Sequence, residues 1–262
     1  VYSMDDVYVS SPSLLKKALI GAAAGFVLSY AICFVLYLFD KRARRADDLA
    51  INVSLPVVAL PERFYGKFSS KRITPEDAVC AYVSAAERVV SLTPDSTRVI
   101  AIAPSAYADP DAALSIAEVY AGSGKRTLVV ECDSRMPLIA EMLLDADESV
   151  VGLDKFITDG TLPTVSNIDE CLDTVTVGDE GEGYLSLRYI KALLEKIGAD
   201  YELVILSLPS ASLLTDLSLL GEIADGVVVS ISRGDRFDRV EDTEKLLSSF
   251  NITVNAVYYL PL

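Results

Sequence analysis

Residues 128–137, LVVECDSRMP, decide the fold of this chain. Three apolar residues lead into an acidic turn, an arginine and a proline, a pattern that indicates a buried strand ending in a polar loop. In parallel α/β sheets, ligands bind outside the carboxyl ends of the strands, where carboxylates hold Mg²⁺ and water. We therefore expect Glu131, Asp133 and Arg135 to lie at the ligand-binding edge of such a sheet.

The sequence on both sides of this stretch alternates β-rich runs with helical patterns. Strands are predicted at 98–103, 127–132, 172–177, 203–208, 227–232 and 253–260, and helices at 74–92, 111–122, 138–144, 185–198, 214–224 and 239–250. Several strands are continuous apolar runs, as expected when helices cover both faces of a parallel sheet. The predicted fold class is α/β, with a doubly wound, mostly parallel sheet.

A membrane span is predicted near the start of the chain. Residues 18–39 form a run of 22 residues without a charge, about 33 Å as a helix, which is enough to cross a bilayer core. Two lysines precede the run and four basic residues follow it at 41–45, so the C-terminal side is expected to be cytoplasmic. The alternative, a cleaved signal peptide, usually has a shorter apolar core and no basic cluster behind it.

These features divide the chain into four predicted parts. They are an extracellular stub (1–13), a transmembrane helix (14–40), a basic juxtamembrane and proline-containing linker (41–73) and a cytoplasmic α/β domain (74–262). The linker contains Pro56 and Pro61, which favour an extended segment.

Charge and composition exclude several classes of function. The chain has a net charge of −15, and residues 71–262 hold 32 acidic and 15 basic residues, a net charge of −17. Such a domain repels phosphate backbones, so nucleic acid is not an expected partner. The chain contains no histidine, which excludes Ser-His-Asp and Cys-His catalysis. Its four cysteines show no CxxC spacing, so a zinc site is not indicated and reduced, structural thiols are expected.

The order of the motifs resembles a known family. Residues 124–126 (GKR) lead into the strand that ends at 131–137, and residues 200–205 (DYELVI) and 224–227 (ADGV) follow. Behind a transmembrane helix, this order resembles the bacterial tyrosine kinases fused to polysaccharide chain-length determinants, the polysaccharide co-polymerases of capsule and exopolysaccharide export. The resemblance implies a P-loop NTPase-like fold and Mg-ATP as cofactor. It also implies a first transmembrane helix and an extracellular domain before Val1.

The expected phosphate-binding loop departs from that family. Such a loop needs glycines, whose N–H groups turn onto phosphate, and a lysine. Residues 99–121 contain no glycine, and residues 99–123 contain no lysine or arginine. Asp109 or Asp111 falls near the lysine position, and Pro110 cannot donate a backbone N–H. Residues 122–127 (GSGKRT) imitate a phosphate loop, but they follow a helix, so a helix C-cap and turn is predicted there.

The residues at the positions that the resemblance assigns to metal and nucleobase binding also differ from those of the family. Glu131 stands where the family has the first Asp of an Asp-x-Asp pair, Ser207 replaces the Walker B Asp, and Leu260 replaces an Asn near the base. We predict no catalytic residue, no nucleotide site and no metal site; any metal would be held by Asp133 and Glu131. The vestigial site positions are Asp109, Asp111, Glu131, Asp133, Arg135 and Ser207. Glu131, Asp133 and Arg135 are then interpreted as a buried, ion-paired strand end.

The sequence therefore predicts a membrane-anchored, non-catalytic co-polymerase or adaptor of the bacterial plasma membrane, with no cofactor. Its kinase-like domain would associate with itself or with a related kinase or export component. The alternative is an active, ATP-dependent protein-tyrosine autokinase with an atypical site. A relative of the partitioning-type ATPases is a third hypothesis, against which the same loop argues.

Overall fold

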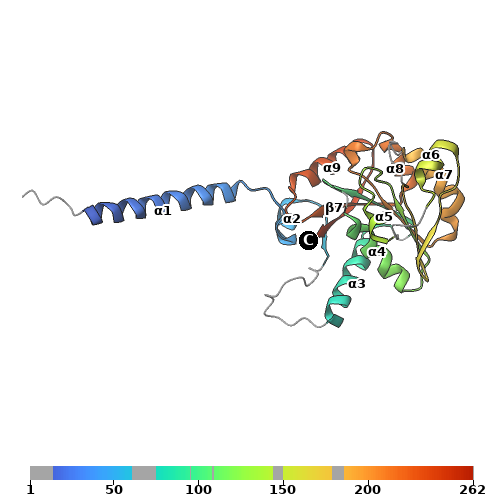
Figure 1. The fold of residues 1–262 in the computed structure, drawn as a ribbon, viewed down its shortest axis with the longest axis horizontal. Helices are drawn as coiled ribbons and strands as arrows, with labels where there is room; N and C mark the ends of the chain where they lie inside the picture. The colour runs from blue at the N-terminus through green and yellow to red at the C-terminus, as the bar shows by residue number, and fades with distance from the viewer. Residues whose placement is uncertain are drawn as a thin grey trace, which may run out of the picture. The chain divides into compact units, whose positions relative to one another are not determined.

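The structure is a computed structural model, which describes residues 14–60, 75–94, 96–107, 109–143, 150–178 and 186–261 (Figure 1). The chain divides into two compact units, Val1–Lys41 and Arg42–Leu262. The predicted stub at 1–13 and the linker residues 61–74 lie outside the described residues.

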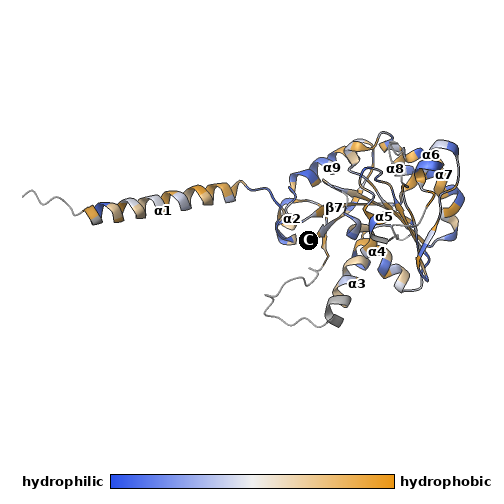
Figure 2. Cartoon of the chain, in the orientation of Figure 1, coloured by the Kyte–Doolittle hydropathy of each residue, from blue (hydrophilic) through white to orange (hydrophobic). Residues whose placement is uncertain are grey.

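The first unit contains one long helix, α1 (Leu14–Leu38). Its stretch from Lys16 to Leu38 is long and apolar enough to cross a membrane, and none of it is buried against protein. Figure 2 colours most of this helix orange to white, toward the hydrophobic end of the scale. Lys16 and Lys17 lie near its start in the sequence. Length and composition thus agree with the predicted span.

The second unit is built on one sheet, in which the described residues form eight strands. The strand order is β1-β8-β7-β2-β6-β3-β5-β4, and all neighbours are parallel except the antiparallel pair β4 and β5. The strands are β1 (Val57–Ala59), β2 (Val99–Pro104), β3 (Thr127–Glu131), β4 (Ser166–Asp169), β5 (Leu172–Val175), β6 (Leu203–Ser207), β7 (Gly226–Ser232) and β8 (Val254–Leu260). This confirms the predicted fold class and its six strands.

Helices cover both faces of the sheet (Figure 1). In β3, Leu128 and Val130 face one core and Val129 faces the other, which explains why the strand is apolar throughout. One face is covered by α2 (Ala46–Asn52), α6 (Leu153–Asp159), α7 (Leu187–Ile197), α8 (Leu220–Ile223) and α9 (Asp238–Ser249). The other face is covered by α3 (Pro75–Ser91), α4 (Pro110–Gly122) and α5 (Leu138–Leu143).

The folded unit begins earlier than the sequence predicted. Ala43 and Leu49 are fully buried in the core, and β1 pairs with the edge strand β8. The backbone of Ala43 also exchanges hydrogen bonds with the loop after β7, donating to Asp235 O at 2.7 Å and accepting from Gly234 N at 2.8 Å. Residues 42–60 therefore belong to the α/β unit, whereas the predicted boundary was residue 74.

The predicted helix at 214–224 is wrong in its first half. Two 3-10 turns, Ala211–Leu213 and Leu217–Leu219, precede the four-residue α8. Between them Asp216 accepts a hydrogen bond from Ser186, the N-cap of α7, so the chain is held out of a continuous helix by this tertiary contact.

Besides α2 and β1, two further elements were missed, because their sequences lack a strong period. The edge strand β4 is polar and pairs through a hairpin, and α6 stands where a loop was expected. The turn before α6 comes so close to the end of β5 that a Cβ on Gly152 would lie 2.2 Å from Gly178 N. The predicted turn after α4 is confirmed, since the helix ends at Gly122 and Gly124 has a φ of +83°.

Candidate functional site

The candidate residues gather at the carboxyl edge of the central strands. Strand β2 lies between β7 and β6, and the chain moves to opposite sides of β2 at this point of the sheet. Such a topological switch point is where open α/β sheets bind ligands. Ser207 of β6 pairs with Ile102 of β2 on one side and with Glu131 of β3 on the other. The structure thus brings the loop after β2 and the acidic turn after β3 to one edge.

The loop after β2 ends in a self-capped helix. Asp109 is the N-cap of α4, and its Oδ1 accepts a hydrogen bond from Asp111 N at 3.0 Å. Its Oδ2 accepts from Ser232 Oγ, at the end of β7, at 3.1 Å. The N-terminus of a helix attracts anions through its free N–H groups and its dipole. Here the protein's own carboxylate occupies that position.

Glu131 is buried at the end of β3, with 2% of its surface exposed. Its Oε1 accepts a hydrogen bond from Ile139 N in α5 at 2.6 Å, while Oε2 is buried without a hydrogen bond of ordinary geometry within the described residues. Burial, with a smaller contribution from the charge of Asp133, raises the pKa of Glu131 to about 7. Backbone N–H groups nearby oppose this shift but do not cancel it. The carboxyl group is therefore engaged with α5.

The acidic turn after β3 is held by its own arginine. Asp133 is 7% exposed, and its Oδ1 accepts a hydrogen bond from Arg135 N at 3.1 Å and lies 3.6 Å from Arg135 Nε. Cys132 lies between these two acids. Burial, and to a smaller extent the charges of Glu131 and Asp133, raise the pKa of its thiol, so the thiol stays protonated. Asp133 and Arg135 thus form an ion pair in which the arginine side chain is 51% exposed, while Glu131 is hydrogen-bonded to α5 instead.

The residues at this edge do not fit Mg-ATP. The loop 104–112 offers no glycine N–H cradle and no cation, and a carboxylate caps α4. Ser207, buried at 8% exposure, supplies no charge beside Glu131. Across the described residues, no three His, Cys, Asp or Glu side chains are grouped so that they could hold a metal ion.

A pocket that sequence reasoning missed opens at the same edge. It has a volume of about 390 Å³ and lies between the loop after β2 (Ser105 to Tyr107), the 3-10 turn after β6 (Ser210 to Leu213) and one side of α9. Of its residues, Ser105 carries a buried Oγ without a hydrogen-bond partner in the described part of the chain. No local motif could have found this pocket, because its place follows from the strand order, which only the structure gives.

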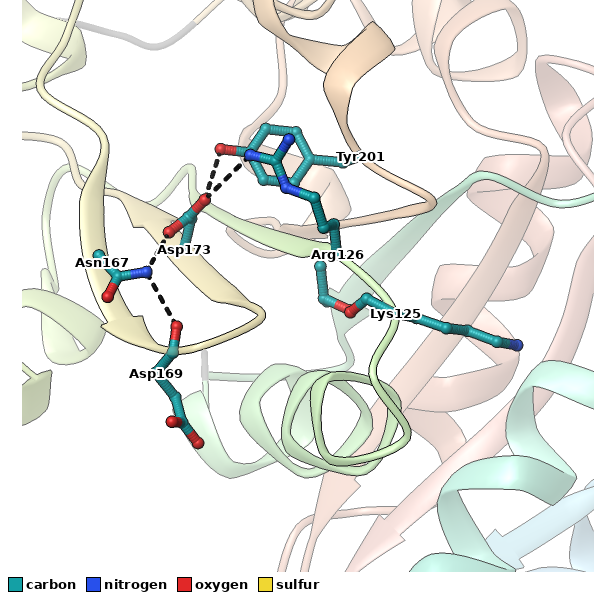
Figure 3. A network of polar contacts seen from close by, with 7 residues as sticks. Lys125, Arg126, Asn167, Asp169, Asp173 and Tyr201 are labelled. Atoms are coloured by element: carbon teal, nitrogen blue, oxygen red, sulfur yellow. Dashed lines mark hydrogen bonds and ion pairs between the residues drawn. The ribbon is translucent and has the colours of Figure 1, made fainter.

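The opposite, amino edge of the sheet carries a polar network (Figure 3). Asp173 of β5 accepts hydrogen bonds from Tyr201 Oη and Asn167 Nδ2, both at 2.8 Å, and lies 3.8 Å from Arg126 Nη2. The Arg126 guanidinium also stacks on the Tyr201 ring, 5.0 Å from its centroid. Burial and the bond to Asp173 raise the pKa of Tyr201 to about 12. Lys125 points away from the network, over the ring of Tyr120.

Sequence comparison finds one relevant curated relative. The tyrosine-protein kinase YwqD of Bacillus subtilis (strain 168) is 29% identical over 128 residues, which are 47% of this chain and 53% of that protein. The match thus spans about half the length of that relative. The chain matches no protein-family profile.

Solved structures share the fold over most of the chain. The chimerical protein CapA2B2 gives a TM-score of 0.64 at 19% identity, covering 83% of this chain and 99% of that one. The kinase domain of the Escherichia coli tyrosine kinase ETK gives 0.61 at 14% identity, covering 81% and 92%. The BceF tyrosine kinase domain gives 0.58 at 20% identity, covering 70% and 77%.

At these identities the structural matches show the fold alone, and the YwqD match adds the relation in sequence. They agree with the resemblance drawn from the motifs around residues 131–137. This chain is thus similar in sequence to one bacterial tyrosine-protein kinase and shares its fold with the solved kinase domains.

Proposed function

We propose that this protein is a membrane-anchored adaptor with a kinase-like domain that no longer binds ATP. The observation that carries the proposal is the Asp109 carboxylate at the N-terminus of α4, hydrogen-bonded to Asp111 N and Ser232 Oγ. A phosphate placed there would meet a like charge instead of a lysine. Two like charges 4 Å apart repel by about 4 kcal/mol at an effective dielectric constant of 20, so the exchange opposes phosphate binding by several kcal/mol.

The other departures act in the same direction. Ser207 gives no Walker B carboxylate, and Glu131 is turned toward Ile139 in α5. The helix α1 would anchor the protein in the plasma membrane, and the basic residues after it favour a cytoplasmic α/β unit. Association with itself or with a related kinase or export component is the proposed activity. The role in capsule or exopolysaccharide export rests on the family resemblance.

The test is calorimetry with Mg-ATP on residues 42–262, which contain every described strand and both cores. We expect no heat of binding at micromolar to low millimolar nucleotide. Asp109→Asn is the informative variant, because the amide keeps an acceptor for Asp111 N and removes the charge. A gain in ATP affinity in this variant identifies the carboxylate as the cause. Micromolar binding by the unchanged protein would overturn the proposal.

An active autokinase is the second candidate. It is favoured by the acidic turn itself, because Asp133 and Arg135 keep the family pattern at the end of β3. This hypothesis expects phosphotyrosine on the purified full-length chain after incubation with Mg-ATP, and its loss in Asp133→Asn. Absence of phosphotyrosine under these conditions rejects it.

A further inference from the structure

The pocket at the switch point is large enough for a small ligand. Its volume of about 390 Å³ falls within the range of roughly 300–1,000 Å³ found for small-molecule sites. Asp109 and Asp111 of the self-capped N-terminus of α4 are not among its lining residues. The pocket is lined by three residues of the loop after β2, three residues of the turn after β6 and four residues of α9.

The charges in the pocket balance. Arg239 and Asp242 are one turn apart on α9, and both side chains are exposed and make no hydrogen bond or ion pair within the described residues. Their opposite charges make the pocket neutral overall. The guanidinium supplies several N–H donors in a fixed geometry, and the carboxylate beside it supplies acceptors. An anion would meet Asp242, and a cation would meet Arg239. A neutral ligand with donors and acceptors close together satisfies both.

Hydroxyl groups form the rest of the polar lining. Ser210 Oγ and Ser212 Oγ lie 3.2 Å apart and bond to each other, and Thr243 lines the wall on α9. Ser105, only 6% exposed, has an Oγ without a partner within the described residues. A buried hydroxyl in this state costs free energy until a partner reaches it, so this side of the pocket favours a hydrogen-bonding ligand.

Two exposed apolar side chains are among the residues that line the pocket. Tyr107 is 69% exposed and Leu213 is 47% exposed, although both side chains are large and apolar. Aromatic rings of this kind bind the flat C–H face of a ring-shaped ligand while its edge remains free for hydrogen bonds. A purely apolar ligand would leave the arginine, the aspartate and the serines unpaired, which is costly.

We propose that this pocket binds a neutral, polyhydroxylated ring of pyranose size, with the ring face on Tyr107 and its hydroxyl groups on Arg239, Asp242 and the serines. Vicinal hydroxyls both donate and accept, which suits a guanidinium and a carboxylate placed one helical turn apart. The proposal does not depend on the loss of ATP binding, because it uses α9 and the turn after β6 instead of the helix terminus that would meet phosphate.

The test is a titration of residues 42–262, labelled with ¹⁵N, with glucose and with N-acetylglucosamine. We expect saturable shifts at the amides of residues 105–107 and 210–213 at sugar concentrations up to about 50 mM, because single small ligands of this kind bind with millimolar Kd. Arg239→Gln and Tyr107→Ala should each weaken binding about tenfold, the size expected when a charged hydrogen-bond donor or a stacking face is lost.

Matched controls are available on other surfaces. Arg188→Gln changes an exposed arginine on α7, and Phe250→Ala changes an exposed aromatic residue at the end of α9. Neither should alter the sugar affinity. Since Tyr107 and Arg239 are exposed, all four variants are expected to keep the fold, which the amide spectrum reports in the same experiment.

Four results decide the matter. Sugar binding that fails only in the two pocket variants supports the proposal. No shift with either sugar, or shifts that the pocket variants leave unchanged, overturns it. Tighter binding of adenosine to the same residues would replace the polyhydroxylated class by a nucleobase. Tighter binding of inorganic phosphate would refute a neutral ligand. Binding of Mg-ATP at α4 would overturn the proposed adaptor function and leave the sugar result intact.

Discussion

The two edges of this sheet treat their polar groups differently. At the amino edge, Asp173 receives hydrogen bonds from Tyr201 and Asn167 and an ion pair from Arg126. At the carboxyl edge, Ser105 Oγ is buried without a hydrogen-bond partner in the described part of the chain, and Glu131 Oε2 is buried without a hydrogen bond of ordinary geometry there.

This difference distinguishes polar groups that stabilise the fold from polar groups that are available to a ligand. The amino-edge network is satisfied but only partly buried, since the Arg126 side chain is 57% exposed. Such a network stabilises a fold, whereas an unsatisfied buried group costs free energy and persists mainly where it serves a ligand or a strained site. The kinase relatives share this fold, and the carboxyl edge is where α/β sheets bind ligands. Under the proposed function the carboxyl edge no longer fits phosphate, and it contains buried polar atoms without a hydrogen-bond partner in the described part of the chain. Changes at the two edges should therefore have unlike consequences for stability.

The largest expected effect is the pH dependence that Glu131 gives to the carboxyl edge. Burial raises its pKa from 4.5 to about 7 in the folded protein, so folding favours the protonated form. Stability should be greatest below pH 4.5 as far as this group is concerned, and should fall by about 3 kcal/mol as the pH rises through 7. The chain contains no histidine, so few other side chains titrate between pH 5 and 8.

Urea unfolding of residues 42–262 at pH 5.5 and pH 8 measures this slope. Glu131→Gln should remove most of it, because the amide is neutral throughout and keeps an oxygen for Ile139 N. Glu195→Gln, on the exposed side of α7, is the control and should leave the slope unchanged. An equal slope in Glu131→Gln would show that another group is responsible.

The next effect is at the amino edge, where Asp173→Ala removes the acceptor of the network. Tyr201 Oη, Asn167 Nδ2 and the Arg126 guanidinium lose their shared partner, and Tyr201 is 6% exposed. We expect a loss of about 2 kcal/mol in the free energy of unfolding, measured in urea at pH 7. Glu195→Ala should change it by less than about 0.5 kcal/mol. A loss no larger than that of the control would mean that this edge is not held by the network.

Tyr201→Phe is a smaller change in the same network. It deletes the hydrogen bond to Asp173 and keeps the ring on which Arg126 stacks. We expect a loss of about 1 kcal/mol, the usual contribution of one hydrogen bond. In a double-mutant cycle with Asp173→Ala, the two losses should not add, because they remove the same bond. Full additivity would contradict the hydrogen bond.

Sequence patterns predicted the layers of this fold well because its strands are apolar on both faces. The continuous apolar run around Val129 and Val130 indicates a buried strand, and the neighbouring strands were predicted from similar apolar runs. The pattern failed where local sequence and tertiary contact disagree. Leu49 looked like part of a linker and lies in the core, while Asp216 interrupts a helical pattern by bonding to Ser186.

The candidate site also had a part that the sequence predicted and a part that only the structure revealed. The sequence of a single loop was enough to identify the missing glycines and the acidic residue Asp109. The structure adds that this acid caps α4. The pocket beside it joins Tyr107 to Arg239, and the amino-edge network joins Arg126 to Tyr201. Neither pair shares a local motif, so the strand order and register had to be known before the residues could be seen as neighbours.

The smallest expected effect gives the sharpest contrast between the edges. Ser105→Ala removes a hydroxyl that is as buried as that of Tyr201 but has no partner within the described residues. Deleting an unpaired buried hydroxyl should cost nothing and stabilise the protein by up to about 1 kcal/mol, since the desolvation penalty disappears with the group. The free energy of unfolding in urea, measured beside Tyr201→Phe, checks the opposite signs. A loss in Ser105→Ala comparable to that of Tyr201→Phe would show that Ser105 Oγ is bonded in solution, and the carboxyl edge would then be as well satisfied as the amino edge.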